Sequence, residues 1–187
     1  LDPLFAEDLS TMRVLSAVYQ TLYTIGPNGS VQPLLADQTT VSADSLEYII
    51  SLKEDVFYHD SEVFNAGVGR RLHARDVKWA YERAARNSVP PAAAALLENI
   101  RGFRSYFMEQ REVYDPAKRV LEGVTGIEVQ NARTLKISLR EKDPEFTRKL
   151  ASPLLSIYPS ESILRSQQTL PERPVGTGPY SFRSADS

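Results

Sequence analysis

Two histidines and two carboxylates fall within fifteen positions of this sequence: His59, Asp60, Glu62 and His73. Imidazole and carboxylate groups are side chains that commonly hold zinc. Their spacing fits no recognised zinc pattern, and both histidines lie beside turn-forming residues. The stretch therefore predicts a solvated loop, and we expect no metal site.

Catalytic and phosphate-binding motifs are equally poorly supported. The chain has no cysteine, which removes thiol nucleophiles, thiolate metal sites and disulfides. A serine triad would need a Gly-x-Ser-x-Gly elbow near a histidine, and no such elbow occurs. Gly176 and Gly178 lack the third glycine and the following helix of a dinucleotide-binding loop. They predict instead an extended segment that passes close to other backbone. We expect no enzymatic activity and no cofactor.

Composition is that of an ordinary globular protein. The 187 residues are 42% apolar and 25% charged, enough for one domain or two small ones with a real core. A net charge of −2 does not provide the clustered basic face that nucleic-acid binding needs. No apolar run approaches the ~18 residues of a membrane helix.

Helix and strand patterns interleave along the chain. Apolar residues three or four positions apart predict helices over residues 15–22, 77–84 and 96–107, with Gly102 as a weak point in the last. Alternating apolar residues predict strands over 46–52, 127–129, 135–139 and 180–182. We also expect Phe57 and Tyr58 to continue a hairpin, and a further helix to start at Asp143-Pro144.

Several short motifs occur in one order. They are Leu1-Asp2-Pro3, Pro33-Leu34-Leu35-Ala36, Ala74-Arg75-Asp76-Val77, residues 134–139, and Gly176-Thr177-Gly178-Pro179-Tyr180. In this order the chain resembles the front part of the family 5 extracellular solute-binding proteins, which include the dipeptide-, oligopeptide- and nickel-binding receptors of ABC importers. It departs from the family at Gln38-Thr39, where many relatives carry tryptophan, and in an insertion over residues 61–71.

The resemblance implies an α+β fold with a mixed β-sheet and flanking helices. This would be part of a periplasmic-binding-protein-like, two-lobe architecture whose second lobe is missing from the chain. Residues 1–24 and 166–187 would be segments of lobe I, and residues 25–165 a subdomain inserted between them. Sheet edges left without their neighbours favour pairing with another chain, so we expect self-association, or disorder at one or both ends.

The function implied is that of the receptor component of an ABC importer. It would capture a peptide or similar small solute outside the cytoplasm and deliver it to a membrane permease. The expected location is periplasmic or extracellular, with or without a lipoprotein anchor whose signal lies outside this chain. The alternative is a ligand-sensing domain of a regulatory protein built on the same fold; a hydrolase lacks a nucleophile arrangement.

The resemblance also implies a ligand-binding loop. In oligopeptide-binding relatives the loop after Leu-Asp-Pro lends backbone groups to an extended peptide, as an added strand does. Counting from Leu1 places those contacts at Glu7 and Leu9. The alternative is that Glu7 and Asp8 only cap the next helix. An aromatic residue that some relatives direct toward the ligand has no counterpart within residues 90–94.

Overall fold

A four-stranded sheet forms the centre of the fold. The structure, a computed structural model, describes residues 1–164 and 174–182. The sheet has the order β3-β4-β6-β5, with bounds Ala36–Val41, Glu47–Leu52, Thr134–Ser138 and Ile127–Asn131. A two-stranded sheet of β1 (Tyr23–Ile25) and β2 (Val31–Pro33) lies beside it. The predicted α+β fold with helices flanking a sheet is confirmed, and the pairings within the described strands are antiparallel.

Alternation along the strands decides which face of the sheet is buried. In β4, Tyr48, Ile50 and Leu52 are buried while Glu47 and Ile49 face solvent. Across the ladder, Ile50 pairs with Leu135 of β6. A shift of one residue would move this whole apolar set to the solvent side. The predicted register of the two strands is confirmed, although Ser138 of β6 is also buried.

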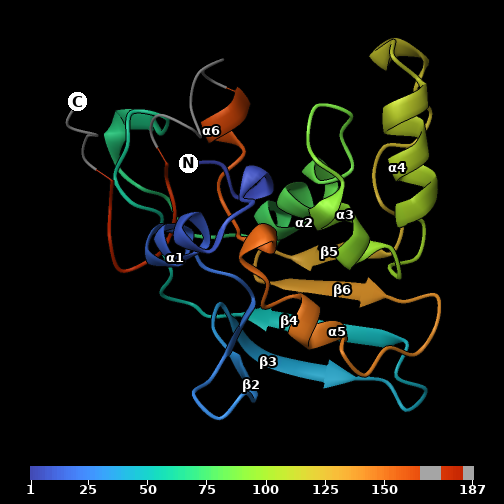
Figure 1. The fold of residues 1–187 in the computed structure, drawn as a ribbon, viewed down its shortest axis with the longest axis horizontal. Helices are drawn as coiled ribbons and strands as arrows, with labels where there is room; N and C mark the ends of the chain where they lie inside the picture. The colour runs from blue at the N-terminus through green and yellow to red at the C-terminus, as the bar shows by residue number, and fades with distance from the viewer. Residues whose placement is uncertain (165–173, 183–187) are drawn as a thin grey trace.

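The helix predicted over residues 77–84 is α2, which begins at Ala74 and ends at Arg83. It lies next to β5 (Figure 1), and Val77 and Tyr81 are fully buried. His73 occupies the cap position, and the carboxylate of Asp76 accepts the amide of His73 at 2.9 Å. Satisfying an otherwise free donor in this way stabilises the start of the helix.

The prediction of a single helix over residues 96–107 is wrong in its extent. The structure has two helices there, α3 (Ala92–Leu97) and α4 (Phe103–Glu112), which are separated at Gly102. Gly102 has φ +79°, and a Cβ at this position would lie 2.2 Å from Oγ1 of Thr125. Glycine is the residue that adopts this backbone region readily. The chain therefore turns at Gly102 and restarts as α4.

Three further local predictions need correction. The helix predicted over 15–22 is α1, from Leu9 to Val18, and Tyr19 and Leu22 are buried beyond its end. Phe57 forms only an isolated bridge with Arg71 instead of a hairpin strand. Residues 180–182 are not a strand. After Asp143-Pro144 the helix α5 is a single turn, Phe146–Lys149; the last helix described is α6, Glu161–Leu164.

The glycine pair does lie in an extended segment that crosses other backbone closely. The amide of Gly178 donates to the carbonyl of Val18 at 2.9 Å, and the carbonyl of Gly176 accepts the amide of His59 at 2.9 Å. A Cβ on Gly176 would lie only 2.0 Å from the same Val18 oxygen. The ring of His59 also hydrogen-bonds the carbonyl of Gly178, at 2.7 Å.

The interpretation of the histidine stretch as a solvated loop is therefore wrong for both histidines. His59 is half buried against the glycine segment, and His73 caps α2. The residues that the structure describes contain no group of three or more histidine, cysteine, aspartate or glutamate side chains placed to hold a metal ion.

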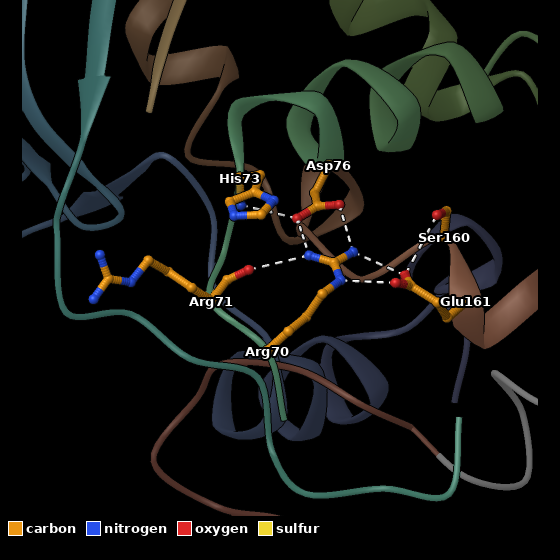
Figure 2. Close-up of polar contacts among 6 residues, drawn as sticks. All are labelled: Arg70, Arg71, His73, Asp76, Ser160 and Glu161. Atoms are coloured by element: carbon orange, nitrogen blue, oxygen red, sulfur yellow. Dashed lines mark hydrogen bonds and ion pairs between the residues drawn. The ribbon is translucent and has the colours of Figure 1, made fainter. Parts of the chain in front are cut away.

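One arginine joins three parts of the chain (Figure 2). The guanidinium of Arg70 donates to both carboxylate oxygens of Asp76, at 2.7 and 2.8 Å, and to both oxygens of Glu161, at 2.7 and 2.8 Å. It also lies 5.2 Å from the ring centre of Tyr58. Bidentate arginine–carboxylate pairs combine strength with fixed geometry. Arg70 thus fixes the insertion against α2 and α6.

Replacing Glu161 tests this cluster through its pH dependence. Hydrogen bonds from Arg70 lower the pKa of Glu161 from 4.5 to about 2. Because the folded-state pKa is depressed, the stabilisation is present above pH 4.5 and is lost as the pH falls toward 2. Since Glu161 is partly exposed, we expect its interaction with Arg70 to contribute about 1–2 kcal/mol to the free energy of unfolding. Urea unfolding of Glu161→Gln should therefore show lower stability at neutral pH and a weaker loss between pH 4.5 and 2. Glu47→Gln, which alters an exposed ion pair, is the control; an unchanged acid limb in Glu161→Gln would contradict the assignment.

Replacing Gly176 tests the close crossing. In Gly176→Ala the new methyl group meets a backbone carbonyl, which cannot swing away as a side chain can. We expect a loss of about 3 kcal/mol in the free energy of unfolding. Gly29→Ala is the comparison, because Gly29 has φ +76° but open space around it, and should cost only about 1 kcal/mol. Equal losses in the two variants would argue against the crossing.

Candidate ligand-binding loop

Residues 6–8 form a short loop between a 3-10 turn, Pro3–Phe5, and helix α1, whose first residue is Leu9. Aspartates hold both ends of this unit. Oδ1 of Asp2 accepts the amide of Leu4 at 3.1 Å, and Oδ1 of Asp8 accepts the amide of Thr11 at 2.8 Å. Side-chain and backbone hydrogen bonds from Thr11 lower the pKa of Asp8. Asp8 is therefore a true helix cap, and the capping alternative holds for this residue.

Of the positions matched to ligand contacts, Glu7 lies in this loop and Leu9 is the first residue of α1. Both are exposed, Leu9 with 75% of its surface. Within residues 1–164 and 174–182, no backbone hydrogen bond uses the amide or carbonyl of Glu7. Glu7 makes no capping bond there either, so the capping alternative does not account for it.

A buried ion pair holds the base of the loop. Arg83, in the last turn of α2, donates from Nη1 to Oδ1 of Asp2 at 2.9 Å and from Nη2 to Oδ2. The side chains of Arg83 and Asp2 are only 8% and 7% exposed. Nη1 of Arg83 also donates to the hydroxyl of Tyr158 at 2.8 Å. The charges are thus both paired and hydrogen-bonded, which a buried pair requires.

The protonation states of this cluster follow from its surroundings. Burial disfavours the charged form of Arg83, but the hydrogen bonds and charge of Asp2 and Tyr158 outweigh it and raise the pKa of Arg83. Burial raises the pKa of Tyr158 to about 12, against the opposing effect of Arg83. The guanidinium stays charged and the phenol stays neutral across the physiological range, so the contact does not change with pH there.

Aromatic residues complete the support. The hydroxyl of Tyr19 donates to the carbonyl of Leu1 at 3.0 Å. The rings of Tyr19 and Trp79 both meet Tyr158 edge-on, with ring centres 6.1 and 5.7 Å apart. Edge-to-face aromatic pairs add to the energy of burial. The chain before the loop is thereby tied to α1 and α2.

The sequence motif indicated the loop but not what holds it. Arg83 lies 81 residues from Asp2, and no local pattern relates two positions so far apart. A hint existed in the composition of α2, where Arg83 falls on the same helical face as the apolar residues Ala80 and Val77. An arginine on an apolar face predicts a buried partner. No pattern in the sequence indicated that Tyr158 would accept a hydrogen bond from Arg83.

The arrangement can offer backbone hydrogen bonds to an extended ligand, because the amide and carbonyl of Glu7 are unused and the Arg83–Asp2 pair holds the base of the loop.

In the described part of the chain, no helix is long and apolar enough to cross a membrane.

Breaking the buried ion pair should be costly. Asp2→Asn and Arg83→Met each leave one partner buried without its counter-charge, so we expect each to reduce the free energy of unfolding by about 3–5 kcal/mol. The double variant should lose clearly less than the sum, because it removes both charges. Denaturant unfolding of the three variants provides the cycle. Additive losses would show that the two side chains do not interact.

Comparison with known proteins shows which proteins the chain is similar to. The chain is 31% identical over 172 residues to a di/tripeptide-binding protein 4 of Pseudomonas aeruginosa, which covers 89% of this chain and 30% of that protein. It is 28% identical to a glutathione-binding protein of Salmonella typhi, over 98% of this chain and 30% of that protein.

Solved structures agree on the fold. The Escherichia coli murein tripeptide binding protein superposes with a TM-score of 0.79 at 18% identity, over 99% of this chain and 33% of that one. The chain therefore spans about a third of the length of the proteins it matches. The family model of bacterial extracellular solute-binding proteins, family 5 middle, matches residues 30–187. With most of its length covered by that match, the chain belongs to the family 5 bacterial extracellular solute-binding proteins.

Proposed function

We propose that this chain contributes one wall of the ligand site in a receptor of an ABC-type importer. The ligand is a short peptide or a similar small solute, and the onward partner is a membrane permease. Family membership supports this proposal, as do relatives named for di- and tripeptides and for glutathione. The family's extracellular character favours a periplasmic or extracellular location, with or without a lipid anchor. The chain performs no catalytic step in this role.

The observation that carries the proposal is the state of Glu7. Its amide and carbonyl are unused by the described residues, and its neighbours on both sides are fixed by aspartate caps. An extended peptide needs such a donor and acceptor to pair in the manner of an added strand. A loop that is already ordered loses little conformational entropy on binding. Leu9 offers an exposed apolar side chain beside it.

The proposed division of the chain is consistent with these contacts. Residues 1–24 and 166–187 are the lobe I segments, and residues 25–165 are the inserted subdomain. The four-stranded sheet lies wholly within the second range. The two lobe I segments meet where Gly178 and Tyr180 donate to the carbonyls of Val18 and Ala17. Residues 166–173 and 183–187 lie outside the part described.

The test uses backbone and side-chain substitutions at the same position. Glu7→Pro removes the amide donor, and Ala6 before it is already extended (φ −77°, ψ 116°), as a residue before proline must be. Glu7→Ala removes the side chain alone. In NMR titrations with tripeptides, amide shifts should cluster at residues 6–9 in the wild type and in Glu7→Ala, and vanish in Glu7→Pro.

Thermal melts with the same peptides measure how complete the site is. A tight ligand at 100 times its dissociation constant adds ~2.7 kcal/mol, which for this size of chain raises Tm by roughly 5–11 °C. One wall of a two-lobe site should give a far smaller shift at millimolar peptide. Peptide-induced shifts that map elsewhere, or are lost in Glu7→Ala as well, would contradict the proposed contact.

A further inference from the structure

Arg86, just after α2, differs from the other arginines of this protein. Among the described residues, every other arginine that is not fully exposed donates to an acceptor or pairs with a carboxylate: Arg70, Arg71, Arg83, Arg111 and Arg119. The guanidinium of Arg86 is half buried and has no such partner within that part of the chain. The guanidinium lies over the ring of Trp79, whose centre is 5.6 Å away.

A second arginine, Arg119, lines the same cavity as Arg86 and has no ion-pair partner among the described residues. Arg119 lies on the segment that runs back along α4 (Figure 1). It donates to the side-chain oxygen of Gln110 at 2.9 Å and to the carbonyl of Val113 at 3.0 Å. These acceptors are neutral, so they orient the guanidinium without balancing its charge. Its Nη2 also donates to the backbone carbonyl of Gln110 at 3.4 Å. With three of its five N–H groups in use, two remain for another acceptor.

The two arginines line one cavity of about 360 Å³ between the end of α2, α4 and the segment that follows α4. Its other polar lining comes from Tyr106, Gln110 and, at the exposed rim, Glu122. A cavity of this size has room for a small ligand beyond a few water molecules. The charged residues of its lining are therefore two arginines, Arg86 and Arg119, and one carboxylate, Glu122.

The surroundings of Arg86 affect its pKa. Burial lowers its pKa, the charges of Arg83 and Arg119 add to this effect, and Tyr106 opposes it. The nearest carboxylate on α2, Glu82, is already engaged: it accepts the amide of Val124 at 2.8 Å and pairs with Lys78 at 3.7 Å. The charges of Glu82 and Arg86 influence each other, but no ion pair joins the two side chains among the described residues. A bound anion would supply the direct ion-pair partner that Arg86 lacks there.

We propose that Arg86 and Arg119, with the hydroxyl of Tyr106, form a binding site for a small oxyanion, either a carboxylate or a phosphate group. The planar guanidinium of Arg86 can present two parallel N–H donors to two oxygens of such a group. Trp79 holds the plane of the guanidinium in place. This site is distinct from the loop at Glu7 and Leu9, and its existence does not depend on the function proposed for that loop.

Calorimetric titrations with inorganic phosphate and with acetate, at constant ionic strength set by chloride, test the proposal. Saturable binding of one ion per chain is expected, and the tighter of the two anions identifies the source of the oxyanion group. Arg86→Gln should weaken binding at least about tenfold, because it removes charge-assisted hydrogen bonds. Arg75→Gln, which alters an exposed arginine of α2, is the control and should stay within about twofold.

A third variant separates loss of the site from loss of the fold. Arg86→Lys keeps the charge but not the planar fork, so it should bind the anion more weakly than wild type and more tightly than Arg86→Gln. Circular dichroism spectra and melting temperatures accompany each titration, and Arg86→Lys decides the outcome if Arg86→Gln is unfolded. No saturable binding of either anion, or equal weakening in Arg86→Lys and Arg75→Gln, overturns the proposal.

Discussion

The buried pair of Arg83 and Asp2 is the contact on which the candidate ligand loop depends. Two charges removed from water are stable only when each is fully paired, and loss of either partner leaves an expensive uncompensated charge. That requirement gives the contact little geometric freedom. Because Asp2 also caps the turn before the loop, the position of Arg83 at the end of α2 determines where Glu7 is presented.

Helix α2 carries this constraint from the sheet to the surface. Its apolar face, with Val77 and Tyr81, is buried, and the helix lies against β5 of the sheet. Near its start, Asp76 binds Arg70 and through it Glu161; near its end, Arg83 binds Asp2. A single helix therefore ties the central sheet to segments near both ends of the described chain. Residues distant in sequence are brought together by charge pairs, while neighbours along the strands are brought together by apolar burial.

The difference between long-range charge pairs and local apolar patterns explains which features the sequence could predict. Alternation of apolar residues located β4 and β6 and their buried faces, because period two is a local property. Local patterns joined two helices into one, because they did not reveal that α3 ends at Leu97 and that Gly102, with a positive φ, is the N-cap of α4. The ligand loop came from a family motif, and its supporting partner Arg83 could not be paired with Asp2 from spacing alone, since nothing local relates them.

The three arginines at or near α2 also show how burial separates structural from binding roles. Arg70 and Arg83 are each neutralised by a carboxylate, so their charges are consumed within the fold. Arg86 follows Arg83 by three residues and is half buried, yet within the described part of the chain its guanidinium lies over the ring of Trp79 and has no ion-pair partner. A fold that stabilises two such cations with fixed carboxylates but leaves the third facing a cavity beside Arg119 keeps a positive charge available for an external partner. The same helix thus positions a loop that offers neutral backbone groups and a pocket that offers charge, and the two features call for ligands of different chemistry.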